Sequence, residues 1–543
     1  MTDERDMTVG SFIRRLATAR GPHPLMIHEG RRLSYAEAER ESGELAVGLL
    51  AAGVGKGTRV AVWMPNGPDW VIAWLAAARI GALVVPINTF YQARELAWVL
   101  VHADCAVLLM SARHLGHDFE ERLVSALPGV AAAAGPELWL RSAPFLRRVF
   151  VWGASARLWA RAAPGALLEL ARAAPAAPAL DDAFVRAVEA EVSPADPMVL
   201  IYSSGSSGDP KGAVHSHAGL LRHALALNAH RRIGPEDRMY SPMPFFWVGG
   251  LVYSLLACMH AGATMLSEES FEPGRTLAML ERERATIAVG WPHYAKSMAD
   301  HESFASRDLS ALHSGNLWAI LPAALRPNDP ERRSNALGMT ETGGPHTYDN
   351  MDRDLPESLR GSFGHAVDGF EHKVVDPATG ATLPAGAVGE ICVRGPGVML
   401  GLAKVERHRV FDTEGYYHTG DSGFFDGDGV LFYAGRLGEL IKTGGANVTP
   451  REVEVALLAF PEVKEAYVVG LPDAARGEVV AAAVVLKAGA RTSGDELKAR
   501  LKKELAAYKV PRHVWLFESG MLPFTDSGKI DKKRLKALLA ERS

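Results

Sequence analysis

The residues from Tyr202 to Gly212 form the densest chemical motif of the chain. They read Tyr-Ser-Ser-Gly-Ser-Ser-Gly-Asp-Pro-Lys-Gly and directly follow the apolar segment 198–201. Glycines let a backbone turn its N–H groups toward an anion, serine hydroxyls add donors, and Lys211 adds a positive charge. We therefore predict a loop that binds a polyphosphate.

Two other interpretations of this loop are weaker. The common nucleotide loop GxxxxGKS does not fit, because Pro210 stands five places after Gly205 and the lysine precedes its glycine. A flexible Ser/Gly linker is also disfavoured, since linkers rarely lie between a buried strand and a helix, which we expect near 218–228. His215 and His217 have no third ligand nearby, so we expect polar loop residues rather than metal ligands.

The elements that must position this loop alternate in type along the first 270 residues. Strand-like runs and helical patterns follow one another, which predicts parallel sheets joined by crossover helices. The expected strands are 59–64, 83–87, 106–110 and 198–201, and the expected helices are 69–82, 93–102 and 218–228. From about residue 360, short strands at 389–394 and 427–433 separated by Gly and Asp turns predict an antiparallel unit.

The last hundred residues have the pattern of a small α+β domain. Thr449 to Glu452, with Pro450, and Ser493 with Glu496 both match the capping box that opens a helix. The two helices then place apolar side chains on one face: Val453, Ala456, Leu457 and Phe460 in the first, and Leu497, Leu501 and Leu505 in the second.

Composition excludes several classes of protein. The 543 residues include 59 basic and 63 acidic side chains, a net charge of −4, which argues against a nucleic-acid-binding surface. With 48% hydrophobic and 22% charged residues, the chain is expected to be globular, with three or four units at about 150 residues each. The three cysteines, Cys105, Cys258 and Cys392, form no CxxC pair, which favours a reducing, cytoplasmic setting.

No segment has the pattern of a signal peptide or a membrane span. The first ten residues lack an apolar core, and the apolar stretches 70–87 and 251–266 are interrupted by Arg79 and His260, so we expect both to be buried. Residues 131–181 are rich in Ala, Arg and Pro, and we expect a surface excursion whose helices are broken at Pro164, Pro175 and Pro178. Peripheral contact of this segment with a membrane is the alternative.

Further motifs make the resemblance to a family specific. The loop resembles the YTSGTTGxPKG signature of the adenylate-forming superfamily, which includes the acyl-CoA synthetases. The other motifs occur in the family's order: Pro242 to Gly250, Leu337 to Glu341 (Leu-Gly-Met-Thr-Glu), Tyr417 to Asp421 (Tyr-His-Thr-Gly-Asp), Gly435-Arg436, Lys442 to Val448, and Pro523 to Ile530. Together they extend over nearly the whole chain.

The resemblance implies an α/β fold in two parts. Residues 1–435 would form the large AMP-binding region, with two parallel or mixed α-β-α sheets and a small β-barrel-like unit. Residues 436–543 would form a small, mobile α+β domain. This domain would rotate between two half-reactions, with Gly438 at the position of the hinge.

The resemblance also implies a role for each matching residue. Phosphates would be bound by Ser203, Ser204, Gly205, Ser206, Ser207, Gly208 and Lys211. Thr340 would bind the α-phosphate and Glu341 would hold Mg²⁺, while Asp421 and Arg436 would bind the ribose and phosphate. Lys529 would bridge the carboxylate and the α-phosphate, and rotation would bring Gly444 and Gly445 to the thiol channel.

The activity implied is that of an ATP-dependent acid–CoA ligase. It would first convert a carboxylic acid and ATP to acyl-adenylate and pyrophosphate. CoA would then attack the acyl-adenylate to give acyl-CoA and AMP. A medium-chain, long-chain or bulky apolar acid is expected, because the sequence around Phe245 and Trp247 is apolar. An enzyme that loads a carrier protein and a non-catalytic nucleotide-binding protein are the alternatives.

Four positions depart from the family's pattern. Leu337 replaces a frequent tyrosine, Trp247 replaces a common histidine, and Gly438 replaces Asp or Lys. The stretch Ser314 to Trp318 stands where the family usually has Gly-Gly-Ala-Pro beside the adenine and acyl pocket. None of these changes removes a charge needed for the chemistry.

Overall fold

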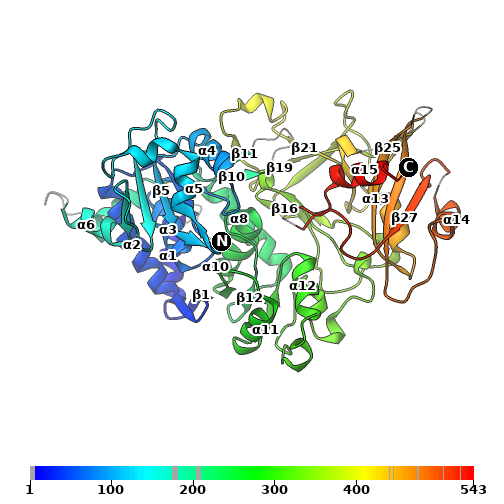
Figure 1. Ribbon diagram of the computed structural model, residues 1–543, viewed down its shortest axis with the longest axis horizontal. Helices are drawn as coiled ribbons and strands as arrows, with labels where there is room; N and C mark the ends of the chain where they lie inside the picture. Colours follow the sequence, from blue (N-terminus) through cyan, green and yellow to red (C-terminus); the bar gives the residue numbers. More distant parts are fainter. Residues whose placement is uncertain are drawn as a thin grey trace.

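The computed structural model describes residues 7–173, 181–203, 210–439, 441–443, 446–473, 476–505, 507–525 and 528–542. It is a mixed α/β structure with several sheets, as expected, and the C-terminal part lies to one side of a larger N-terminal part (Figure 1). None of the helices in these ranges is long and apolar enough to cross a lipid bilayer.

Two mixed sheets form the centre of the N-terminal part. The larger has the order β20-β11-β10-β4-β3-β5-β8-β9, with β10 through β9 parallel and β11 and β20 antiparallel. Its strands are β3 (Arg59–Trp63), β4 (Leu83–Pro86), β5 (Val107–Ser111), β8 (Arg148–Trp152), β9 (Ala160–Ala163), β10 (Pro197–Ser203), β11 (Lys211–Ser216) and β20 (Gly401–Leu402). The expected strands at 59–64, 83–87, 106–110 and 198–201 are therefore confirmed.

The second sheet has five strands in the order β14-β12-β13-β1-β2. They are β1 (Pro24–His28), β2 (Arg31–Ser34), β12 (Arg238–Tyr240), β13 (Thr264–Ser267) and β14 (Ile287–Ala288). All neighbours are parallel except β1 and β2, which form an antiparallel pair.

Helices cover both sheets in layers. The largest core lies between the two sheets and is filled by α1 (Val9–Arg20), α2 (Tyr35–Ala51), α3 (Pro68–Arg79), α8 (His217–Arg231), η3 (Leu251–Leu256) and α10 (Ala257–Ala261). A second core packs α4 (Ala93–His102) and α5 (Phe119–Ala126) on the outer face of the larger sheet. A third packs α11 (Pro273–Arg282) and α12 (Pro292–Ala299) on the outer face of the smaller sheet. The apolar stretches 70–87 and 251–266 fill the central layer, as expected for buried segments.

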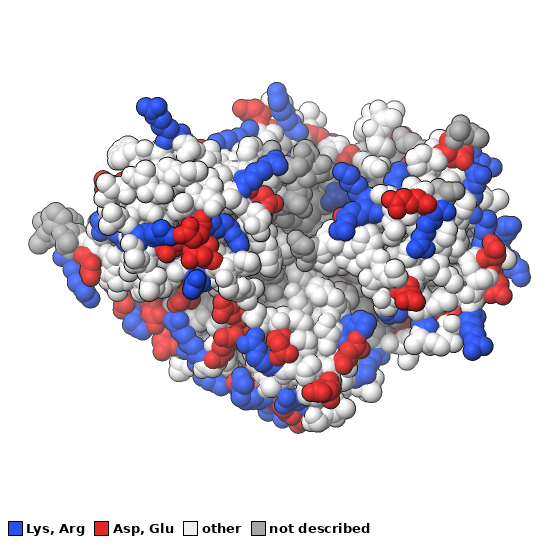
Figure 2. All heavy atoms as spheres, in the orientation of Figure 1, with Lys and Arg blue, Asp and Glu red and all other residues white. Residues whose placement is uncertain are grey.

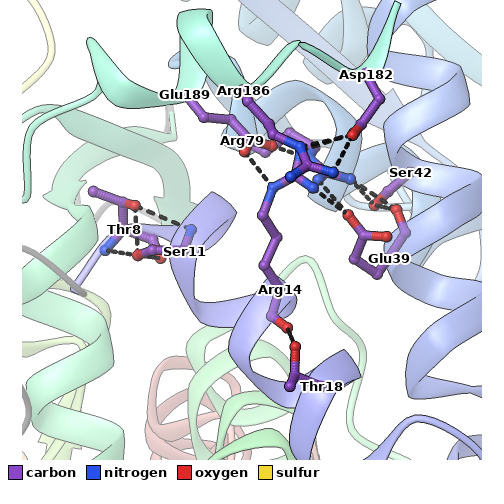
Figure 3. A network of polar contacts seen from close by, with 10 residues as sticks. All are labelled: Thr8, Ser11, Arg14, Thr18, Glu39, Ser42, Arg79, Asp182, Arg186 and Glu189. Carbon is purple, nitrogen blue, oxygen red and sulfur yellow. Dashed lines mark hydrogen bonds and ion pairs between the residues drawn. The ribbon is translucent and has the colours of Figure 1, made fainter.

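A buried arginine ties the helices of this central layer together (Figure 3). Arg79 at the end of α3 is fully buried and donates hydrogen bonds to Glu39 and Ser42 of α2 and to Glu189 of α7 (Asp182–Ala190). Arg14 of α1 binds the same two carboxylates, with Nε 2.6 Å from Glu189. The arginine that interrupts the apolar stretch is therefore satisfied by partners from two other helices.

The expectation of a surface excursion at 131–181 is wrong for residues 148–163, which include β8 and β9. Strands β8 and β9 extend the larger sheet by parallel backbone pairing, with β8 beside β5 and β9 beside β8. Trp159 is also buried. Trp139 does lie on the surface, with the Arg147 guanidinium 4.2 Å from the centre of its ring. Pro164 precedes α6 (Gly165–Ala173), whereas Pro175 and Pro178 lie outside the described residues.

Smaller sheets follow in the chain. β15 (Leu337–Met339), β16 (Gly344–Tyr348) and β17 (His365–Ala366) form one, and β18 (Glu371–Val375), β19 (Gly389–Arg394), β21 (Tyr417–Phe425) and β22 (Leu431–Arg436) form an antiparallel sheet in that order. The expected antiparallel unit is thus present as a four-stranded sheet.

The C-terminal part has its own sheet and core. Its strands are β23 (Ile441–Thr443), β24 (Ala446–Val448), β25 (Val463–Asp473), β26 (Gly477–Leu486) and β27 (His513–Phe517). Helices α13 (Pro450–Leu458) and α14 (Gly494–Glu504) pack on one face, and α15 (Lys532–Ala540) packs on the other. Arg451 of α13 forms an ion pair of 2.6 Å with Glu331 of the N-terminal part.

Candidate active site

Two strands of the larger sheet hold the ends of the predicted phosphate loop. β10 and β11 are antiparallel, and Ser203 is paired with Lys211 in their register. Lys211 is exposed and lines an open cavity of about 440 Å³ together with Trp98, Arg409 and His418. The rest of the predicted loop lies outside the described residues: Ser204, Gly205, Ser206, Ser207 and Gly208.

The Thr340–Glu341 turn lies beside the end of β10. The Ser203 hydroxyl donates to Oε1 of Glu341 at 3.5 Å, so the structure brings these two predicted residues together. The turn, η8 (Thr340–Thr342), connects β15 to β16. Glu341 forms no ion pair with any residue in the described ranges.

The backbone of this turn is held from several sides. Nε2 of His215 donates to the carbonyl of Thr340 at 2.8 Å, and the N–H of Met399 donates to the carbonyl of Glu341 at 2.8 Å. Gly343 has φ +68°, and a Cβ there would lie 2.7 Å from Cδ2 of Leu220. These contacts fix the main chain and leave the Glu341 carboxylate facing Ser203.

The expectation that His215 and His217 are polar loop residues is wrong. Both are buried, His215 in β11 and His217 at the first position of α8, where its Nδ1 accepts a hydrogen bond from the N–H of Val9 at 3.2 Å. Burial lowers the pKa of His215 to about 4, so its ring is neutral at pH 7 and one nitrogen carries the proton donated to Thr340. Apolar neighbours at 213 and 214 were the only sequence signal for this burial.

Asp421 and Arg436 face each other across two antiparallel strands. They are register partners in β21 and β22, and Nε of Arg436 lies 3.0 Å from Oδ1 of Asp421. The Asp421 side chain is 3% exposed, whereas that of Arg436 is 50% exposed. The Arg436 guanidinium also donates to the carbonyl of Thr419 at 2.8 Å, and the Tyr433 hydroxyl lies 3.4 Å from Oδ1 of Asp421. The carboxylate is thus fixed, while the arginine can reach solvent.

Tyr417 links this pair to the Thr340–Glu341 turn. Burial raises the pKa of its phenol well above the ordinary value, and the carboxylates of Glu341 and Asp421 raise this pKa further, while Arg436 opposes them. Those three charged side chains therefore lie close enough to influence one phenol electrostatically. Residues that are far apart in the sequence converge here on a single polar region.

Lys529 lies on a turn of the C-terminal part that reaches the N-terminal part. Its N–H and carbonyl pair with Thr525, and the preceding Gly528 has φ +75°. A Cβ at position 528 would lie 2.6 Å from Nδ1 of His293 in α12, so this turn packs directly against that helix. The Lys529 side chain is exposed, and within the described ranges no hydrogen bond or ion pair joins it to Thr340, Glu341 or Asp421.

The positions that depart from the family pattern differ in their surroundings. Leu337 is buried in an apolar cluster with Ile391 and Leu431. Trp247 packs edge to face on Trp291, with ring centres 5.7 Å apart. Gly438 is exposed in the short turn η11 (Leu437–Glu439), and Gly444 and Gly445 lie outside the described residues.

The surface is hollowed between the two parts of the molecule. Figure 2 shows this hollow near the middle of the face, with Lys and Arg side chains on the rim formed by the smaller part. A basic rim attracts anionic ligands.

Two family profiles match the sequence. The AMP-binding enzyme family matches residues 13–403, and the AMP-binding enzyme C-terminal domain matches residues 452–529. The phosphate loop and the motifs up to Glu341 fall inside the first range, most of the motif that contains Lys529 falls inside the second, and the remaining motifs lie between the two.

Characterised relatives match over nearly the whole chain. A CoA ligase of Mycobacterium tuberculosis, named for a 7a-methyl-1,5-dioxo-octahydroindenyl propanoyl group, is 33% identical over 98% of this chain and 99% of its own. The mitochondrial medium-chain acyl-CoA ligase ACSF2 of Bos taurus is 30% identical over 94% of this chain and 83% of its own. The crystal structure of ATP-bound MatB from Rhodopseudomonas palustris superposes with a TM-score of 0.75 at 26% identity, covering 98% of this chain and 99% of that one.

Proposed function

Because the chain belongs to the AMP-binding enzyme family, we propose that it is an AMP-forming acid–CoA ligase. A carboxylic acid and ATP give acyl-adenylate and pyrophosphate, and the thiol of CoA then displaces AMP to give acyl-CoA. The observation that carries this proposal is that Ser203 contacts Glu341 and Arg436 pairs with Asp421, while Glu341, Asp421 and Arg436 are all close enough to Tyr417 to shift its pKa. ATP, CoA and the acid are its substrates.

The first half-reaction needs positive charge and donors around the triphosphate. In this proposal Ser203, Lys211 and the serines and glycines of the loop between them, residues 204–208, bind the phosphates, and Thr340 binds the α-phosphate. The Glu341 carboxylate fits a Mg²⁺ ion, because it offers hard oxygen ligands and has no cationic partner in the described ranges. When bound, Mg²⁺ would neutralise phosphate charge.

The ribose would be held by Asp421 and Arg436. Asp421 is an ionisable carboxyl fixed in a nearly buried position, which suits it to accept hydrogen bonds from ribose hydroxyls. Arg436, half-exposed beside it, can turn toward the ribose or a phosphate without losing its own strand position.

Lys529 would act only in the first half-reaction. We assign it to the negative charge that develops between the carboxylate and the α-phosphate. The part from residue 436 onward would then rotate relative to residues 1–435, with Gly438 in the hinge, and bring Gly444 and Gly445 to the thiol channel. The packing of Gly528 on His293 supports an arrangement in which the lysine turn faces the N-terminal part.

The acid is proposed to have a medium-length, long or bulky apolar body. The two named relatives act on a medium-chain acid and on a propanoyl group carried by a fused ring, which fits this range. We also place the enzyme in the cytoplasm, since its three cysteines are free and buried.

Lys529→Ala tests the division between the two half-reactions. We expect acid-dependent exchange of pyrophosphate into ATP to fall by about 10²–10³-fold, as when one donor to a developing negative charge is removed. Thioester formation from supplied acyl-adenylate and CoA should fall far less. Lys533→Ala, an exposed lysine on the neighbouring helix, is the matched control and should leave both rates unchanged. Equal losses in both half-reactions for Lys529→Ala would contradict its role.

AMP release from ATP over short, medium, long, aromatic and ring-fused acids, with and without CoA, tests the overall reaction. Release that requires one class of acid and CoA supports the ligase. Pyrophosphate exchange that ignores CoA would indicate a carrier protein as acceptor, and ATP binding without turnover of any acid would indicate a non-catalytic protein.

A further inference from the structure

A small, partly open cavity lies at the end of β16 remote from the Thr340–Glu341 turn. Its volume is about 20 Å³, which is room for one small group. The wall combines the end of α8, part of η3, the strand β14 and two loops: His230, Arg231, Tyr253, Ile287, Ser314 to Asn316, Tyr348 and Asn350 to Asp352. β16 starts at Gly344 beside the turn and reaches Tyr348 in this wall, a separation of roughly 13 Å at about 3.3 Å per residue.

The wall contains a buried arginine without a carboxylate partner. Arg231 is 9% exposed, and its guanidinium carbon lies 3.7 Å from the centre of the Tyr253 ring. It donates to the carbonyl of Tyr253 and lies 3.7 Å from Sδ of Met239. Throughout the described ranges no acidic side chain is within ion-pair distance of it. A buried charge in this state is costly unless something else hydrogen-bonds to it.

Asp352 does not supply that partner, although it lines the same cavity. Its carboxylate accepts a hydrogen bond from the Ser314 hydroxyl at 3.0 Å, and its N–H bonds to Asn350. The charge of Asp352 therefore stays in the wall beside Arg231 without pairing with it. A second negative charge brought into the cavity would be repelled by this carboxylate, whereas a neutral oxygen would not.

Other groups of the wall also offer hydrogen bonds. The phenols of Tyr348 and Tyr253 both line the cavity, with ring centres 6.5 Å apart, and burial raises the pKa of Tyr348 well above its ordinary value, so it keeps its proton. Nε2 of His230 is buried and has no partner among the residues that the structure describes. A plain alkyl chain would leave these polar groups buried against methylene carbons.

We propose that this wall recognises a ketone oxygen at the end of the substrate remote from its activated carboxyl, with Arg231 as the main donor. The inference rests on the proposed function and narrows the substrate class to oxo-acids with an apolar body. The body would lie along β16, and the carbonyl would enter the cavity. Arg231 is thus a specificity residue that contacts the substrate but not its reacting atoms.

The test compares two acids of equal length, dodecanoate and 11-oxododecanoate, which are long enough to extend from the Thr340–Glu341 turn to the cavity, by kcat/KM for AMP release in the presence of CoA. For the wild type we expect 11-oxododecanoate to be favoured by at least about tenfold, since a hydrogen bond to a charged group contributes about 1.5–3 kcal/mol. In Arg231→Met the preference should fall to near one. Arg232→Met, the exposed neighbour on the same helix end, should keep the wild-type ratio.

Three results would overturn the inference. They are a wild-type ratio of one or less, a ratio unchanged by Arg231→Met, or a preference for dodecanedioate over 11-oxododecanoate, which would indicate a carboxylate instead. Where Arg231→Met does not fold, Tyr348→Phe serves in its place, because it removes one hydroxyl from the same wall and should lower the ratio severalfold. Failure of the proposed function is distinguishable, since then neither acid would give AMP.

Discussion

Two buried arginines in the central helical layer have opposite surroundings. Arg79 is fully buried and donates to Glu39, Ser42 and Glu189, from two helices other than its own (Figure 3). Arg231, 9% exposed, has a carbonyl, a thioether and an aromatic ring around it but no carboxylate within ion-pair distance in the described ranges. Arg79 lies away from any site residue, whereas Arg231 lines a cavity.

The difference separates a structural charge from one available to a ligand. A buried guanidinium with two carboxylates is neutralised within the fold, and its removal leaves those carboxylates buried without a partner. A buried guanidinium without a carboxylate retains unused donors, and a substrate oxygen can satisfy them. The same residue type therefore stabilises the fold at one position and selects a substrate at the other.

Arg79→Met should show the largest effect on stability. It leaves Glu189 and Glu39 with the single remaining cation Arg14, and we expect the free energy of unfolding to fall by about 3–5 kcal/mol. Urea denaturation followed by circular dichroism measures this change. Arg40→Met, on the exposed face of α2, is the control and should cost less than about 0.5 kcal/mol.

Arg231→Met in the same assay should cost less, about 1.5–3 kcal/mol, because the main loss is one hydrogen bond from a charged group to the Tyr253 carbonyl. If this variant were as destabilised as Arg79→Met, the two arginines would both be structural. The distinction drawn between the two positions would then fail.

His223 extends the comparison to pH. It is fully buried in α8, neither ring nitrogen has a partner among the described residues, and burial together with the nearby His215 lowers its pKa to about 3. The unfolded chain, with an ordinary pKa near 6.5, binds a proton between these values that the folded chain does not. Stability contributed here is therefore complete above about pH 6.5 and is lost as the pH falls, by about 2 kcal/mol at pH 5.

His223→Leu removes this titration while keeping an apolar group of similar size. We expect the variant to lose about 2 kcal/mol less than the wild type between pH 7 and pH 5, measured by urea denaturation at both values. The other groups that face this cluster, His215, His346 and His372, are unchanged in both proteins. Parallel pH curves for the two proteins would show that His223 is not the group that titrates.

The sequence predicted the sheets and helices well because their signals are local. The alternation around 59–110 and the helix at 93–102 depend on neighbours within a few residues. The structure has these elements within one or two positions of the expected bounds, except that the helix expected at 69–82 ends three residues earlier, at Arg79. The surroundings of Arg79 could not be predicted, because Glu39 and Glu189 lie 40 and 110 residues away. Local patterns do not report such partners.

The candidate site divides in the same way. Motif residues such as Ser203 and Glu341 can be identified in the sequence because their spacing to neighbours matches a family pattern. Their contact at 3.5 Å, however, results from the pairing of strands that are distant in the sequence. His215 was taken for a loop residue because its role, holding the Thr340 carbonyl, has no local signature. Arg231 has none either, since an arginine at the end of a helix is ordinary for the helix dipole.

Two helix caps in the C-terminal part compare a hydrogen-bonded polar side chain with one that makes no cap hydrogen bond, and here the smallest change in stability is expected. Thr449 with Glu452 and Ser493 with Glu496 look alike in the sequence, yet the Ser493 side chain accepts from the N–H of Glu496, whereas the Thr449 side chain makes no cap hydrogen bond. Ser493→Ala should therefore cost about 1 kcal/mol and Thr449→Ala a few tenths, measured as shifts in the midpoint of urea denaturation. Pro450 at the first position of α13 already favours the helical backbone there. Removing the Thr449 hydroxyl should therefore change the stability little. Equal losses would mean that the Thr449 hydroxyl caps its helix in solution, and that the sequence pattern alone was the better guide.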